Sequence, residues 1–238
     1  MKFIFLIYYK FIESFFHLPR IKKFIKKNLK FKKPLIFDVG AYEGSTLKLF
    51  YEIYSQGKFC CFEPNKTKYD QLKKIKIKQM QVFNTALGSV NKNASMRINP
   101  IDMTNSISKL KKNSFYLKIK NFIIRKNIYK IILEKIEMIK LDTFCLKKKI
   151  NKINILKIDT EGYEFNVLKG SQKILENVDF IIIELQNNDM YEGYSRKKIE
   201  NFLKNNNFKK IKSFQFPLMF FEDCIYQNLR FKSFKNFN

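Results

Sequence analysis

From Pro34 onward the chain alternates short apolar runs with stretches of helical periodicity, and this alternation constrains its fold more than any other feature. The runs at residues 35–39 and 153–158 are continuously apolar or nearly so, as in strands that are buried on both faces of a sheet. Such strands, separated by helices, predict an α/β fold with a doubly wound, mainly parallel sheet. We expect strands at residues 35–39, 58–62, 81–84, 153–158, 180–183, 208–213 and 224–231, and helices at 45–54, 65–75, 164–175 and 195–204, with Ser45 as an N-cap.

Two segments depart from this rhythm. Residues 89–136 hold Asn, Ser and Lys clusters between short apolar pieces, which predicts an inserted β-hairpin and loop with a short helix around 115–135. A strand-like piece at 137–141 then leads into Asp142. We therefore expect a basic N-terminal helical extension at residues 1–33 and one domain at 34–238, interrupted by an insertion at about 89–136.

The chain carries 47 Lys and Arg against 21 Asp and Glu, a net charge of +26, which favours anionic partners. After Pro19, Ile21, Phe24, Ile25 and Leu29 repeat at helical spacing, and lysines fill the other face. Residues 19–33 therefore either contact an anionic membrane or form an extra helix packed on the domain with a solvated lysine face. The apolar stretch at 3–9 is too short to span a bilayer and no cleavage site follows it, so we expect a cytoplasmic protein, peripheral at the inner membrane face if it docks there.

The four cysteines show no metal-type spacing, and the single histidine, His17, lies far from them in the sequence. Because Cys60 and Cys61 are adjacent in a predicted strand, their side chains should point to opposite faces of the sheet. We expect reduced structural thiols and predict no metal site.

Ligands of such sheets bind where the parallel strands end, and the ends of the first three strands carry suitable residues. The first strand runs into the turn Asp38-Val39-Gly40-Ala41-Tyr42-Glu43-Gly44, where a glycine allows a close approach of the backbone to a ligand. Glu63-Pro64 follows the second strand, at the position from which an acid accepts hydrogen bonds from ribose hydroxyls; the alternative is that Glu63 caps the next helix. Asn84-Thr85-Ala86 ends the third strand, where it would flank an adenine.

The fourth strand ends in the densest polar cluster of the chain, Lys157-Ile158-Asp159-Thr160-Glu161-Gly162-Tyr163-Glu164. Period-two alternation places Lys157 and Asp159 on one face. A buried lysine needs an acidic partner, so Lys157 should pair with Asp159 or with Glu184 of the fifth strand. The pair could equally be a structural ion pair without a catalytic role.

With these pieces in order, the chain resembles the FkbM family of S-adenosylmethionine (SAM)-dependent methyltransferases. The resemblance rests on segments 37–41, 62–65, 141–144, 156–162 and 167–170, of which Lys-Ile-Asp-x-Glu-Gly is the most specific, and covers roughly residues 34 to 186. It implies a Rossmann-like class I methyltransferase fold, with a seven-stranded, mainly parallel sheet whose last strand is antiparallel. Tyr42 departs from the asparagine that is common at its position in the family.

The resemblance also implies O-methylation, with sugar hydroxyls of surface glycans such as lipooligosaccharide or capsule, or hydroxyls of related metabolites, as acceptors. The residues expected to bind SAM are Asp38, Gly40, Ala41, Glu43, Glu63, Pro64, Asn84 and Ala86. Asp159 and Glu161 are the catalytic candidates, because a hydroxyl is a poor nucleophile that gains from a general base. One of the two could instead bind acceptor hydroxyls or a divalent cation, although we rank a metal below the base role. His17 precedes the fold and is not expected to serve.

Two other functions stay open at this point. The basic charge would suit an RNA 2′-O-methyltransferase, although the fourth strand lacks the motifs of amino-group and carbon methylation, and we rank nucleic acid below a hydroxyl acceptor of glycan or metabolite type. A non-catalytic, membrane-associated scaffold with the same fold is the other alternative. The acids retained after strands one, two and four argue against a scaffold, which has no need of them.

Overall fold

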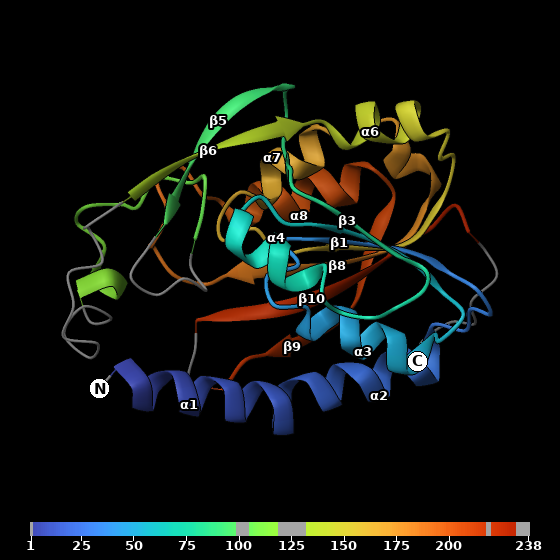
Figure 1. Cartoon of the computed structure of the whole chain (residues 1–238), viewed down its shortest axis with the longest axis horizontal. Helices are drawn as coiled ribbons and strands as arrows, with labels where there is room; N and C mark the ends of the chain where they lie inside the picture. Colours follow the sequence, from blue (N-terminus) through green and yellow to red (C-terminus); the bar gives the residue numbers. More distant parts are fainter. Residues whose placement is uncertain (1, 99–104, 119–131, 218–219, 232–238) are drawn as a thin grey trace.

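A seven-stranded sheet in the order β3-β2-β1-β7-β8-β10-β9 forms the centre of the molecule (Figure 1). The computed structural model describes residues 2–98, 105–118, 132–217 and 220–231, and the side chains from residue 7 onward within them. The strands of the sheet are β1 (Leu35–Val39), β2 (Lys58–Phe62), β3 (Met80–Phe83), β7 (Ile153–Ile158), β8 (Val178–Gln186), β9 (Phe208–Gln215) and β10 (Phe221–Asn228). β3, β2, β1, β7 and β8 are parallel to one another, whereas β10 runs antiparallel to both β8 and β9. The predicted fold class, including the antiparallel last strand, is confirmed.

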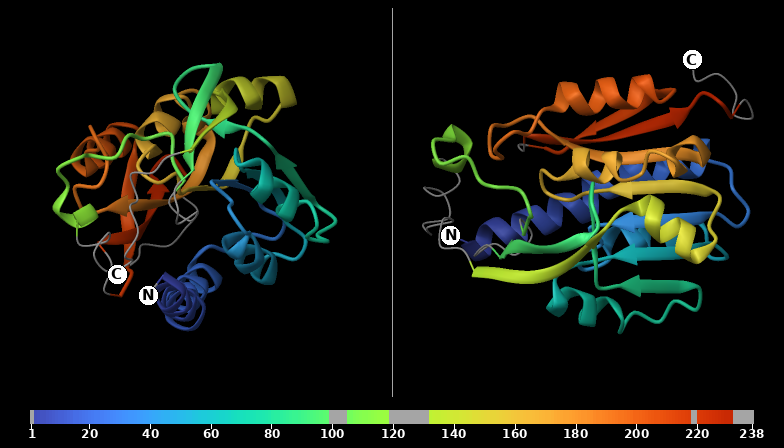
Figure 2. Two further views of the ribbon diagram at one scale, coloured as in Figure 1. Left: turned by 60° about the vertical axis from the view of Figure 1, so that its left-hand side comes forward. Right: turned by 90° about the horizontal axis from the view of Figure 1, so that it is seen from above.

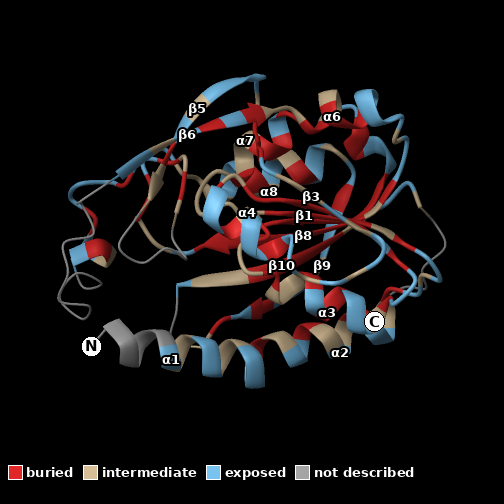
Figure 3. Ribbon diagram, viewed as in Figure 1, coloured by how far each residue is buried: buried red, intermediate tan, exposed pale blue. Residues whose placement is uncertain are grey.

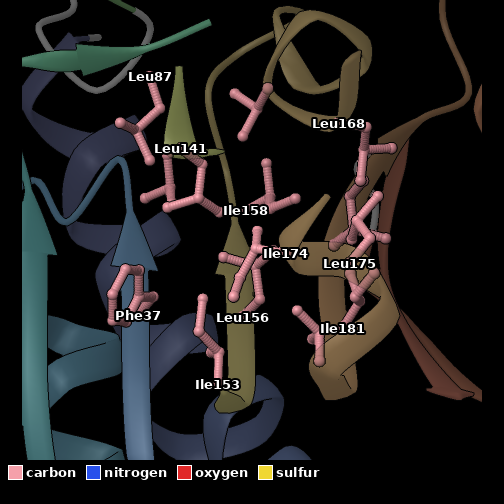
Figure 4. Close-up of a cluster of buried hydrophobic side chains, with 14 of the residues drawn as sticks. Phe37, Leu87, Leu141, Ile153, Leu156, Ile158, Leu168, Ile174, Leu175 and Ile181 are labelled. Atoms are coloured by element: carbon pink, nitrogen blue, oxygen red, sulfur yellow. The ribbon is translucent and has the colours of Figure 1, made fainter. Parts of the chain in front are cut away.

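Helices cover both faces of this sheet (Figure 2). α2 (Leu18–Asn28) and α3 (Ser45–Ile53) pack on one face, and α6 (Leu141–Lys148), α7 (Glu164–Lys169) and α8 (Arg196–Asn205) pack on the other. A cluster of buried apolar side chains lies between the sheet and the helices on each face. Figure 4 shows the cluster beneath α6, α7 and α8, in which Leu156 and Ile158 of β7 lie among side chains that are removed from water. Cys60 belongs to this cluster and Cys61 to the opposite one, as the alternation in β2 predicts.

The helix starts differ in part from the predictions. α3 begins after Gly44, whose φ of 81° is left-handed, so Ser45 is the first helical residue and not the N-cap. α4 (Lys66–Leu72) is capped by Asn65, whose side chain accepts from the Lys68 N–H at 3.0 Å. α8 is capped in the same way by Ser195.

The helix predicted at 164–175 is split into α7 and a short 3₁₀ helix, η3 (Ile174–Asn177). The cause is Asp142 at the start of α6, whose carboxylate accepts from the N–H groups of Lys173 and Ile174. These amides are satisfied by a side chain and not by a continuing helix, so the chain turns at Gly170.

The insertion forms a second, three-stranded sheet, β4-β6-β5, from β4 (Ala86–Leu87), β5 (Lys92–Ile98) and β6 (Ile132–Ile139). The piece predicted as a strand at 137–141 is the end of β6, and Leu141 already belongs to α6. Of the short helix predicted around 115–135, residues 115–118 are helical, and residues 119–131 lie outside the described part of the chain.

The N-terminal segment is helical from residue 2, in keeping with the helical extension expected at residues 1–33. α1 (Lys2–Ile12), a π-helical turn η1 (Glu13–His17) and α2 follow one another without a break. Pro19 lies inside this continuous helix, where it cannot donate a backbone hydrogen bond, and the π turn ends two residues before it. Ile21, Ile25 and Leu29 are buried against the domain, which leaves the lysines of α2 outward. Within the described residues, no helix combines the length and apolar character needed to cross a membrane.

Candidate active site

A cavity of ≈ 380 Å³ opens at the carboxyl ends of β1, β2 and β7, where the order of strands reverses along the chain. Its size falls within the range of small-molecule sites. The predicted site residues that line it are Gly40, Ala41, Glu43, Glu63, Pro64, Ala86, Asp159 and Glu161. Asp38 and Asn84 lie outside its lining.

The turn after β1 is shaped by contact with β7. Gly40 has a φ of 82°, and a Cβ at this position would lie 1.8 Å from the carbonyl oxygen of Asp159. The N–H groups of Gly40 and Ala41 both donate to the carbonyl of Phe62, at 3.0 and 3.1 Å. The glycine therefore brings the ends of β1, β2 and β7 together at one point of the cavity wall.

Glu63 is held rigidly at the end of β2. Its Oε2 accepts from the Tyr42 N–H and its Oε1 from the Asn65 N–H, both at 2.8 Å. Burial raises the pKa of Glu63 to about 7, although these two bonds oppose the shift. Asn65, not Glu63, supplies the side-chain cap of α4, so the capping alternative for Glu63 does not describe this turn. Asn84 supports the same turn from outside, donating to the carbonyls of Glu63 and Pro64 at 3.0 and 2.9 Å.

Asp38 lies beneath the cavity, inside the sheet. It pairs in register with Lys157 of β7 and is buried. Its Oδ2 has no hydrogen-bond partner among the described residues, and burial raises its pKa to about 7. A direct contact of Asp38 with a cofactor stays a prediction.

Three carboxyl groups converge on the opposite wall of the cavity. Oxygens of Asp159, Glu161 and Glu184 lie within 4.8 Å of one another. Burial raises the pKa of Asp159 and, more strongly, that of Glu184, where the neighbouring acids add to the effect. Glu161 accepts a hydrogen bond from the Tyr191 hydroxyl. This cluster can take up a proton from a hydroxyl or bind hydroxyl groups of a ligand.

The loop that carries these acids is closed by a further acid, Glu164. Its Oε1 accepts from the backbone N–H groups of Thr160 and Gly162, each at 3.0 Å, and from the Thr160 hydroxyl at 3.1 Å. Glu161 is thereby held at a φ of 52°, a conformation that costs free energy in a non-glycine residue. Glu164 therefore shapes the loop between Asp159 and α7.

Lys157 is the centre of a chain of charged groups. Its Nζ lies 3.3 Å from Asp159 Oδ2, which confirms the first predicted pairing, and 3.0 Å from Oδ1 of Asp223 on β10. The second partner is therefore Asp223 and not Glu184. Burial opposes the charged form of Lys157, but the surrounding carboxylates outweigh it and raise its pKa.

His17 extends this chain to the N-terminal helix. Its Nε2 lies 2.8 Å from Asp223 Oδ2, and both groups are buried. The N-terminal helix thus returns His17 to the sheet beside the site, so its early position in the chain is no reason to exclude it as a base; that it does not serve as the base stays a prediction. The pKa of Asp223 is held below its usual range, because Lys157 and His17 outweigh the effect of burial.

The same helix closes one side of the cavity with Tyr9, Lys10, Glu13 and Ser14. Lys10 pairs with Glu43 at 3.1 Å, and burial together with the nearby Asp159 raises the pKa of Glu13 to about 7. The sequence prediction missed these residues. A signal existed, because positions 9, 13, 17, 21 and 25 repeat at a spacing of four, but the first three are aromatic or polar and do not read as an apolar face.

Replacement of His17 should measure how firmly the helix is fixed. We expect His17→Ala to lower the free energy of unfolding by about 2–3 kcal/mol, because it leaves a buried oxygen of Asp223 without its partner. Phe16→Ala, on the neighbouring exposed position, should change it by less than about 0.5 kcal/mol. Urea unfolding of the two variants measures both values; equal small effects would show that apolar packing alone holds the helix.

Comparison with known proteins gives a consistent result. The family model described as "Methyltransferase FkbM domain" matches residues 38–210. The 2-O-methyltransferase NoeI of Sinorhizobium fredii (strain NBRC 101917 / NGR234) is 22% identical over 163 residues, which are 67% of this chain and 66% of NoeI. The crystal structure of methyltransferase FkbM from Methylobacillus flagellatus KT shares the fold with a TM-score of 0.54 and 13% identity, over 83% of this chain and 44% of that one. The chain thus spans just under two thirds of NoeI and less than half of the solved protein.

Proposed function

The chain belongs to the FkbM methyltransferase family, and from this premise we propose that it is a SAM-dependent O-methyltransferase. The proposed acceptor is a hydroxyl group, of a sugar in a surface glycan or of a related metabolite. One observation carries the proposal: Glu63 lies at the end of β2 on one side of the cavity, and the carboxyl cluster at the ends of β7 and β8 lies on the other.

The residues that line the cavity at the ends of β1 and β2 and at β4 fit SAM; we call this part the SAM-binding half of the cavity. Glu63 has both oxygens fixed by backbone amides and lines the cavity, so it can accept hydrogen bonds from ribose hydroxyls without further ordering. Phe62, Ala86 and Leu87 supply apolar wall on which an adenine can pack. Gly40, Ala41, Glu43 and Pro64 complete this half of the lining.

The carboxyl cluster suits an acceptor hydroxyl. When bound, SAM supplies an electrophilic methyl group on a sulfonium; the residues of this chain have to orient the acceptor oxygen and take its proton. Asp159 is the proposed base, because burial raises its pKa and Lys157 fixes the carboxylate in place. Glu161 and Glu184 then bind neighbouring hydroxyls. The name of NoeI, a 2-O-methyltransferase, agrees with oxygen as the methylated atom.

The two alternatives have weaker support. Three carboxyl groups within 4.8 Å of one another repel the phosphates that surround an RNA 2′-hydroxyl. A scaffold would need neither the fixed Glu63 nor the paired Asp159. Salt-sensitive RNA binding would favour the first alternative, and failure to bind SAM at millimolar concentration would favour the second.

The proposal is tested on the glycans of cells that lack the gene. We expect loss of a methyl increment from one sugar by mass spectrometry, restored by the native gene and not by a variant that cannot bind SAM. Unchanged glycans would contradict a glycan acceptor. In that case, formation of S-adenosylhomocysteine by the purified protein with small hydroxyl compounds would separate a wrong acceptor from a wrong reaction.

Replacement of Glu63 should weaken SAM binding. A hydrogen bond to a charged group contributes about 1.5–3 kcal/mol, so Glu63→Gln should raise the Kd for SAM about ten- to hundredfold in calorimetry. Because the pKa of Glu63 is about 7 and the carboxylate is the stronger acceptor, the affinity of the native protein should increase as the pH rises through 7. That increase should be smaller in Glu63→Gln, where other carboxyl groups near the cavity such as Glu13 still titrate near pH 7.

Asp142→Asn is the matched control for this experiment. Its carboxylate also accepts from two backbone N–H groups, but outside the cavity lining. It should lose stability and keep its affinity for SAM. An unaltered Kd in Glu63→Gln would show that the ribose assignment is wrong.

A further inference from the structure

The outward face of the N-terminal helix exposes a row of large apolar side chains. Ile7, Phe11, Phe15 and Phe16 are 54%, 49%, 67% and 51% exposed, and we call these residues the aromatic stripe. The ring of Phe11 lies 4.9 Å from that of Phe15 and 5.8 Å from that of Phe16, between centroids. Contiguous exposed apolar side chains of this size are typical of a surface that meets another phase or partner.

Cations follow the stripe along the same continuous helix. From α2 to Lys30, the apolar side chains of Ile21, Ile25 and Leu29 are buried against the domain, so the basic side chains point outward. The exposed ones are Arg20, Lys23, Lys26, Lys27 and Lys30. Figure 3 shows the helix along one edge of the molecule, where exposed residues alternate with intermediate and buried ones.

We propose that this face docks the protein on an anionic membrane surface. An aromatic stripe beside a run of cations matches a bilayer interface, in which rings enter the headgroup region and lysines meet lipid phosphates. The chain's net charge of +26 acts in the same direction. A nucleic acid fits less well, because its bases stack on aromatic rings that line a basic groove, whereas here the rings and the cations occupy successive parts of an outer helix face.

Docking in this way has a consequence for the cavity. The inner face of the same helix supplies Tyr9, Glu13 and Ser14 to the cavity wall. One helix diameter, about 10–12 Å, would then separate the bilayer from the cavity. Where the proposed methyl transfer holds, the acceptor is met at the membrane surface.

Co-sedimentation of the full chain with vesicles tests the aromatic stripe. We expect binding to vesicles of phosphatidylcholine with phosphatidylglycerol and much weaker binding to phosphatidylcholine alone. Phe15→Ser with Phe16→Ser should reduce partitioning at least about tenfold. Leu146→Ser is the matched control: Leu146 is 80% exposed and lies on α6, on the opposite face of the sheet, and its loss should not change partitioning (Figure 1).

A second pair of variants tests the cations. Each basic residue near an anionic surface increases partitioning about fivefold, so Lys26→Gln with Lys27→Gln should reduce it about 25-fold. Lys147→Gln with Lys148→Gln removes the same charge from α6, where both residues are exposed, and should have a much smaller effect.

Three results would overturn the proposal. Equal losses from the α2 and α6 pairs would mean that the overall charge, and not this face, attracts the vesicles. An unchanged affinity after removal of Phe15 and Phe16 would exclude insertion of the stripe. Absence of vesicle binding together with salt-sensitive binding to RNA would assign the face to nucleic acid. Because SAM binding is measured without vesicles, failure here leaves the proposed function untouched.

Discussion

Asp159→Asn should lower kcat for methyl transfer about a thousandfold, while the affinity for SAM stays close to that of the native protein. The carboxylate is the proposed acceptor of the hydroxyl proton, and loss of a general base costs about 10²–10⁴ in rate. Asparagine has the same shape but cannot take up a proton at neutral pH. Rates measured with the acceptor identified from glycan analysis, together with calorimetric SAM binding, separate kcat from cofactor affinity.

The fold should survive this replacement. Leaving a buried charge without its partner typically costs about 3–5 kcal/mol, but Lys157 keeps Asp223 at 3.0 Å when Asp159 is replaced. Asp159→Asn should therefore destabilise the protein by less than that amount in urea.

Asp179→Asn provides a control for the general effect of removing a buried strand acid. Asp179 is paired with Lys152 at 3.1 Å and lies outside the cavity lining, so its replacement should affect stability and not kcat. A chelator should also leave native turnover unchanged, since Asp159 is proposed as a base and not as a metal ligand. Native turnover in a folded Asp159→Asn variant would contradict the role.

The pattern of apolar runs predicted the sheet well because its central strands are buried on both faces. β1, β2 and β7 have the predicted bounds. β8 is longer than the predicted 180–183, because Asp179, Glu184 and Gln186 are also buried. Polar residues of this kind look like strand ends in a sequence, and only partners that are distant along the chain, such as Lys152 for Asp179, allow them inside.

The candidate site was predictable where it follows a strand end and unpredictable where it depends on long-range contacts. Gly40, Glu63 and Asp159 could be placed because parallel strands end at the same edge. Asp223 reaches Lys157 across 66 positions of sequence, and His17 reaches Asp223 across 206. No local periodicity predicts such pairings, and the helical extension expected at residues 1–33 gave no sign that it brings His17 back to the sheet.

Gly40→Ala should have the largest effect on stability of any single methyl addition considered for this chain. The left-handed backbone costs an alanine about 1–2 kcal/mol, and its Cβ would lie 1.8 Å from the carbonyl oxygen of Asp159, a backbone atom that cannot move alone. We expect a loss of more than about 4 kcal/mol, comparable with the whole stability of many domains. Soluble yield, urea unfolding and SAM binding of any folded fraction measure the outcome.

Two other glycines separate the cost of the left-handed backbone from the cost of the steric clash. Gly193 has a φ of 70°, and among the described residues no atom beyond its chain neighbours lies within 4 Å of an added Cβ. Gly193→Ala should therefore cost only the free energy of the left-handed backbone, about 1–2 kcal/mol. Gly170 has an ordinary φ of −85°, but its Cβ would lie 1.9 Å from the Gly88 carbonyl oxygen, so Gly170→Ala reports the clash alone. Gly40→Ala should exceed both and should also abolish SAM binding, because Gly40 alone of the three lines the cavity. Suppose instead that Gly40→Ala lost no more free energy of unfolding than Gly193→Ala. The turn after β1 would then have room to move away from β7, and the fold would not require the close contact between Gly40 and Asp159.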